Sequence, residues 1–241
     1  MTMKNKAIIA ISALALCALA VSCKNGAKKD GEAAQKIINE TALRAAVKNE
    51  DLFVVRQLIQ AGADVNATDE DEMTALMIAA EYGTADIVRM LINAEADVNA
   101  TNNDGLNALI LNDDETPLMR AAWHNAADAA KVLIEAGANV NARDRWGNTA
   151  LMSAAFSNAA DAVNVLIQAG ADVNARDDNG DTALIYAAGN NAADTAKLLI
   201  EAGADVDARG NYGQTALMWA EKTGSEDLIA LLKAAGAKTE E

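Results

Sequence analysis

The chain has 241 residues and a mass of 25.1 kDa, and 51% of the residues are hydrophobic but only 3% are aromatic, so we expect a core packed by small and branched aliphatic side chains. The 20 basic and 35 acidic residues give a net charge of −15, which repels phosphate backbones and argues against a nucleic-acid partner. One His and two Cys exclude most metal and nucleophile sites, so we expect no enzyme and no cofactor.

The N-terminus has the pattern of an export signal. Lys4 and Lys6 precede an apolar run over residues 7–21, which is shorter than the roughly 20 residues that a membrane-spanning helix needs. We therefore expect residues 1–22 to be a signal peptide.

The end of this segment, Ala-Val-Ser-Cys at residues 20–23, resembles the lipobox of bacterial lipoproteins, whose Cys is diacylated and becomes the mature N-terminus. The resemblance implies lipidation of Cys23, a polar tether over residues 23–39, and an exported protein held at the bacterial cell envelope by its lipid alone. It departs from the usual pattern in having Ala20 where a Leu is common. Cleavage after residues 18–20, an Ala-Leu-Ala site, is the alternative and would release a soluble secreted or periplasmic protein.

From residue 62 onward a short motif recurs. It reads Gly-Ala-Asp-Val-Asn-Ala at residues 62–67, and close variants begin at Glu95, Gly137, Gly170 and Gly203. The fifth position of the motif recurs at one constant interval from 66 to 99, from 141 to 174 and from 174 to 207, and at a longer interval from 99 to 141. A fixed period with one insertion predicts a stacked solenoid, because each unit buries its apolar faces against its neighbours.

Each period predicts two helices. A Thr suited to cap the first helix stands at Thr74, Thr116, Thr149, Thr182 and Thr215. A residue that tolerates left-handed backbone ends this helix at Gly83, Asn125, Asn158, Asn191 and Gly224. The second helix carries Val163, Leu166 and Ile167 at helical spacing and ends at Gly170, before a tight turn.

This unit resembles the ankyrin repeat. The family signature T-P-L-H-x-A-A appears as Thr-Pro-Leu-Met-Arg-Ala-Ala at residues 116–122 and, with Ala for Pro, in four other copies, where the usual His is replaced as well. The replacing residues, which imply apolar packing in place of an inter-repeat hydrogen bond, are Met77, Met119, Met152, Ile185 and Met218. The resemblance implies an all-α solenoid over residues 40–241, made of six stacked helix-turn-helix units joined by β-hairpin turns.

Three acidic clusters and the single His are candidate sites. Residues 69–72 and 177–181 lie where the repeat needs a hairpin turn, and a calcium loop starting at the second would require Glu where Ala188 stands. We expect residues 113–115, Asp-Asp-Glu, to be a solvated loop. His124 has no second group to act with, so we assign it no ligand role.

The longer interval leaves an insertion at residues 106–114. Its first residues look like a partial copy of residues 181–185, which is compatible with a duplication that has no function. Alternatively, four large aliphatic side chains make the insertion an apolar finger at the edge of the binding face: Leu106, Leu109, Ile110 and Leu111.

The placement of the aromatic residues is the strongest functional signal. Phe53 is the one ring expected to face the core. The other seven occupy slots through which ankyrin proteins usually touch partners, namely Tyr82, Trp123, Trp146, Phe156, Tyr186, Tyr212 and Trp219. Trp123, Trp146 and Phe156 belong to consecutive repeats and should converge on one stretch of the concave face.

The sequence therefore predicts a monomeric, non-enzymatic scaffold for protein-protein interaction, which binds another protein through the concave face of helices and hairpins. A small-ligand binder, or an accessory to an enzyme, is the alternative and would need a deep pocket with convergent polar groups. A purely structural spacer would show no affinity and would tolerate mutation of the aromatic residues.

Overall fold

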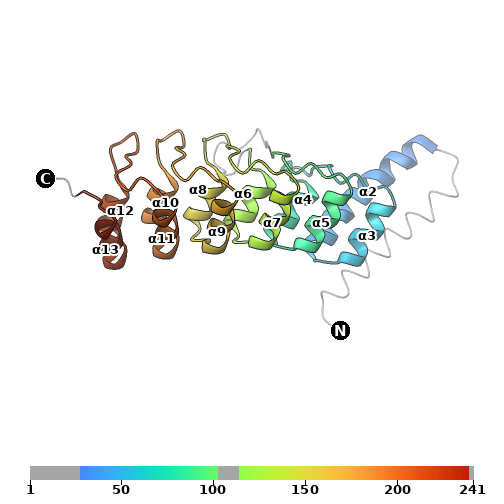
Figure 1. Cartoon of the computed structure of the whole chain (residues 1–241). Helices are drawn as coiled ribbons and strands as arrows, with labels where there is room; N and C mark the ends of the chain where they lie inside the picture. The colour runs from blue at the N-terminus through green and yellow to red at the C-terminus, as the bar shows by residue number, and fades with distance from the viewer. Residues whose placement is uncertain (1–27, 103–113, 239–241) are drawn as a thin grey trace.

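The computed structural model describes residues 28–102 and 114–238, which form an elongated stack of helices (Figure 1). This part of the chain contains twelve helices and no strand, so the predicted all-α solenoid is confirmed. The helices come in six pairs: α2 (Lys28–Lys48) with α3 (Leu52–Gln60), α4 (Ala75–Glu81) with α5 (Ala85–Asn93), α6 (Pro117–Trp123) with α7 (Ala127–Glu135), α8 (Ala150–Phe156) with α9 (Ala160–Gln168), α10 (Ala183–Gly189) with α11 (Ala193–Glu201), and α12 (Ala216–Thr223) with α13 (Glu226–Ala234).

The first helices of successive repeats pack in one row and the second helices in another. Every Thr predicted as a cap accepts a hydrogen bond from the backbone N–H three residues later, as at Thr149, whose Oγ1 lies 3.4 Å from the Met152 nitrogen. The predicted stop residues also have left-handed backbone, with φ of 56° at Asn158 and 73° at Gly224. Local chemistry therefore sets both ends of each first helix.

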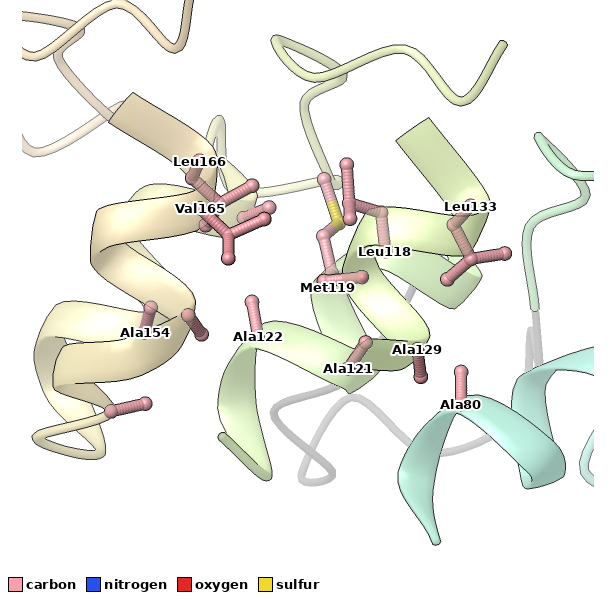
Figure 2. Packing of buried hydrophobic residues seen from close by; sticks show 14 of the residues in the cluster. Ala80, Leu118, Met119, Ala121, Ala122, Ala129, Leu133, Ala154, Val165 and Leu166 are labelled. Atoms are coloured by element: carbon pink, nitrogen blue, oxygen red, sulfur yellow. The ribbon is translucent and has the colours of Figure 1, made fainter. Parts of the chain in front are cut away.

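The core consists of small and aliphatic side chains, as the composition predicts. Ala80, Ala121, Ala122 and Ala154 lie on successive first helices and are fully buried, and this lets the helices approach closely (Figure 2). The residues that replace the signature His are buried at Met77, Met119, Met152 and Ile185, but Met218 is 38% exposed. Met218 belongs to α12, in the last of the described helix pairs.

An asparagine ladder connects the repeats on the surface. Asn141 accepts a hydrogen bond from the Asp172 nitrogen at 2.8 Å and donates one to the Gly170 carbonyl at 3.4 Å. The same pair of bonds recurs at Asn66, Asn99 and Asn174. The Asn of the repeated motif therefore serves as a link to the next repeat.

The turns between repeats differ from the predicted β-hairpins. Within the described residues they are short tips closed by two backbone bonds, such as those from the Asp144 nitrogen to the Asn148 carbonyl at 2.9 Å and from the Gly147 nitrogen to the Asp144 carbonyl at 3.0 Å. The only bridge among these residues is an isolated one between Thr68 and Thr74. A tip of this length has room for one turn but not for a ladder.

Helix α2 spans Lys28–Lys48, so the boundary predicted at residue 40 lies inside a helix. The predicted signal peptide, Cys23 and residues 106–113 of the insertion lie outside the described residues. Within the described ranges, no helix has both the length and the apolar character needed to cross a bilayer.

Candidate functional site

An aromatic groove of about 390 Å³ lies where α6, α8 and α10 meet two loop tips. It is lined by Glu115, Trp123, Asp144, Trp146, Asn148, Met152, Ser153, Phe156, Asp177, Asn179 and Tyr186. Four of the seven predicted partner-binding residues are in this set, including the three that we expected to converge. The groove therefore brings these four residues together.

Three of the rings form a continuous row. Trp123 and Phe156 occupy equivalent slots of successive repeats, and their ring planes stack at a centroid distance of 5.0 Å and an angle of 20°. Tyr186 meets Phe156 edge-on at 6.1 Å, because the equivalent slot of its own repeat holds Gly189 and leaves space. Trp123 is 39% and Phe156 is 41% exposed, so this row presents apolar surface to solvent.

Tyr186, one of the predicted contact residues, is half-buried. Its hydroxyl donates to Oδ2 of Asp177 at 2.7 Å and lies 3.1 Å from Oδ1 of Asn148. Burial and the neighbouring Asp177 carboxylate raise the pKa of Tyr186, so the hydroxyl remains a donor at neutral pH. Tyr186 therefore forms the floor of the groove.

The tip that carries Trp146 is held from two sides. Within the tip, Oδ1 of Asp144 accepts from the backbone nitrogens of Trp146 at 2.9 Å and Asn148 at 2.7 Å. From the next tip, the Asp178 nitrogen donates to the Trp146 carbonyl at 3.0 Å. Gly147 has a φ of 78° and no room for a Cβ beside Asp178. The backbone of Trp146 is thus held in place, and its side chain is 42% exposed.

Glu115 contradicts the expected solvated loop, because only 7% of it is exposed. Its backbone nitrogen donates to Oδ1 of Asn102 at 2.8 Å, which draws it inward at the base of the insertion. The carboxylate pairs with Nη1 of Arg120 at 2.9 Å, while Nη2 of Arg120 contacts Glu81 at 2.7 Å. Arg120 therefore divides its charge between two carboxylates.

The carboxylates of the groove are incompletely compensated. Burial raises the pKa of Glu115 to about 7 despite the attraction of Arg120. Burial also raises the pKa of Asp144, against the hydrogen bonds that it accepts. No burial signal in the sequence marks either residue, although Asp144 occupies the same slot as Asp177 of the next repeat.

The remaining predicted contact residues lie apart from the groove. Tyr82, 46% exposed, borders a separate polar depression together with His124, and Tyr212 is 84% exposed on the last tip. The Trp219 ring is half-buried and lies beneath the ammonium of Lys222, 4.3 Å from its centroid. The predicted set therefore separates into one cluster of four and three isolated rings.

Phe53 contradicts the core position predicted for it, since it is 72% exposed. The buried residues of α3 are Val55 and Leu58. Their helical spacing places position 53 on the opposite side, toward solvent.

The acidic clusters considered as calcium sites accept backbone hydrogen bonds within the turns. Oδ1 of Asp69 accepts from the backbone nitrogens of Asp71 and Met73, and Oδ1 of Asp177 accepts from that of Asp181. Over residues 28–102 and 114–238, no three His, Cys, Asp or Glu side chains are grouped so that they could hold a metal ion.

Comparison with known proteins agrees with the geometry. The family described as ankyrin repeats (3 copies) matches the chain over residues 9–102, 43–144, 102–177 and 151–241. No curated protein matches the chain.

Proposed function

Since the chain belongs to the ankyrin-repeat family, we propose that it is a non-enzymatic scaffold that holds a partner protein in the aromatic groove. Ankyrin repeats are generally modules for protein-protein interaction. The observation that carries the proposal is the exposed stack of Trp123 and Phe156 beside Trp146, whose backbone is held by two tips. Large rings in a patch that a partner can desolvate are the usual energetic centre of an interface.

The groove suits a rigid mode of binding. The ring row lies on helices packed in series, and two tips joined by a backbone bond hold Trp146. Because this surface is already ordered, binding a partner costs little conformational entropy of the groove. We therefore infer a monomer that presents a preformed surface.

Photo-crosslinking in the producing cells tests this proposal. A photoreactive phenylalanine replaces Asn179, an exposed residue of the groove, or Lys197, an exposed residue of the second-helix row. We expect a protein adduct of one defined mass from position 179, reduced at least about fivefold by Trp123→Ala. Equal yields of adduct from positions 179 and 197 would contradict a partner in the groove. So would a yield from position 179 that Trp123→Ala leaves unchanged.

The proposed location is the bacterial cell envelope, with Cys23 as a lipidated N-terminus. The support is the sequence alone: a positive start, a short apolar run and the lipobox-like residues 20–23. Mass spectrometry of the mature protein should find a diacylated chain that begins at Cys23, and Cys23→Ser should abolish the lipid. An unmodified chain beginning at Val21 would instead establish cleavage after Ala20 and a soluble protein.

A further inference from the structure

The first helix of each repeat has two positions equivalent to Ser153 and Phe156 of α8. Over successive repeats, these positions form a row across the groove face. At one end of this row the slots hold Glu81 and Arg120, and the guanidinium of Arg120 lies between two carboxylates. At the other end they hold Trp219 and Lys222, and the ammonium of Lys222 lies over the indole. In both places the chain supplies its own cation to acidic or aromatic partners.

Between these two ends, the groove has rings and the carboxylate of Asp144 but no basic side chain in its lining, while Glu115 at its edge is already paired with Arg120. Its lining combines the rings of Trp123, Phe156 and Trp146 with the carboxylates of Glu115 and Asp144, and none of the described residues that line it is Lys, Arg or His. Arg143 and Arg176 of the adjoining tips donate instead to backbone carbonyls of the following tips. No basic side chain of the described residues thus occupies the centre of the row.

We propose that the groove receives a cationic side chain, an alkylammonium or a guanidinium, from the partner protein. This inference rests on the proposed function and specifies its chemistry. The ring faces attract a cation through their quadrupoles, and the aliphatic stem of Lys or Arg covers the exposed apolar surface. Asp144 supplies the opposite charge, and burial has already removed part of its hydration. Glu115, which shares Arg120 with Glu81, adds to this charge above its pKa of about 7.

Charge also selects the orientation of the partner. The chain carries −15 overall, so a basic segment is attracted at long range and an acidic one is repelled. The partner's segment should therefore present Lys or Arg within an otherwise neutral or basic surface.

The test uses the full chain with 15N-labelled tryptophan, because Trp219 lies outside the groove and serves as an internal reference. The probes are capped pentapeptides with Lys, Arg or norleucine between Gly pairs. We expect the Lys or the Arg probe to shift the indole signals of Trp123 and Trp146 with saturation, and to leave Trp219 unchanged. Comparison of the two identifies the ammonium or the guanidinium as the preferred group.

Three further measurements make the result specific to charge and place. The norleucine probe should bind at least about tenfold more weakly, Glu115→Gln should weaken the cationic probe about threefold or more, and Tyr212→Ala, remote from the groove, should leave it unchanged. Equal binding of norleucine, or no shift with either cation, would overturn the inference. A groove-dependent adduct at position 179 would then still support the proposed function, with a neutral partner surface.

Discussion

The protonation state of Glu115, a residue of the groove, affects the stability of the fold. Its usual pKa is 4.5, and burial raises it to about 7 because loss of hydration outweighs the attraction of Arg120. Between these values the folded chain binds more protons than the unfolded chain, so this group's contribution to stability is complete below about pH 4.5 and is lost as the pH rises through about 7.

Glu115→Gln should remove this pH dependence. The difference in the free energy of unfolding, variant minus unmodified protein, should increase by about 2–3 kcal/mol between pH 5 and pH 8. Urea denaturation at several pH values measures this difference. Asp128→Asn changes a carboxylate that is 81% exposed and should give a curve parallel to that of the unmodified protein. A parallel curve for Glu115→Gln would show that Glu115 keeps its usual pKa.

The hydroxyl of Tyr186 contributes to the stability of the fold, and its position was not predicted from the sequence. Tyr186→Phe removes the donor 2.7 Å from Asp177 and leaves that buried carboxylate with one partner fewer. We expect a loss of about 1–2 kcal/mol in the free energy of unfolding, measured by chemical denaturation. Tyr212→Phe, at an exposed ring, should change it by less than about 0.5 kcal/mol and serves as the control.

The single-residue predictions succeeded where the repeat period decides the position. Trp123 and Phe156 stack because equal slots on successive repeats must lie side by side. The predictions for Phe53 and Glu115 were wrong although the repeat period assigns each of them a slot. The slot of Phe53 holds an Asp in each of the other five repeats, so the period itself marks it as a solvent-facing position. Glu115 is buried through Asn102 at the base of the insertion, where the repeat is interrupted.

At the scale of helices and turns, local sequence was informative because the interactions are local. A Thr cap or a left-handed Asn acts within a single helical turn, so one repeat suffices to recognise it. The tips were harder to predict, because each is also bonded to its neighbour, as by the Asp178 nitrogen to the Trp146 carbonyl.

The asparagine ladder makes a prediction at this scale. Asn141→Ala removes two bonds that join its repeat to the next, at 2.8 and 3.4 Å, and should cost about 1–2 kcal/mol in the free energy of unfolding. Asn164→Ala changes an exposed residue of α9 that bonds only to Gln168 and should cost less than about 0.5 kcal/mol. Equal effects in thermal or urea denaturation would mean that the ladder adds nothing to repeat coupling.

At the scale of the whole molecule, the array continues across the insertion. Helix α4 packs against α6, and α5 packs against α7, although the sequence between the two repeats is longer than elsewhere. Each repeat is covered on both sides except at the ends, so its stability depends on interfaces with its neighbours. Unfolding should therefore be one transition rather than several.

Leu166→Ala tests this cooperativity from the middle of the stack. Leu166 is fully buried in α9, so its truncation should cost about 2–5 kcal/mol in the free energy of unfolding. Variants that retain only Trp123 or only Trp219 report on different repeats, and urea unfolding should give both the same midpoint. Leu166→Ala should lower both midpoints equally, while Gln168→Ala, exposed on the same helix, should lower neither. If the Trp219 transition stayed in place while that of Trp123 moved, the repeats would unfold as separate units, because an interface that couples them must transmit the loss in both directions.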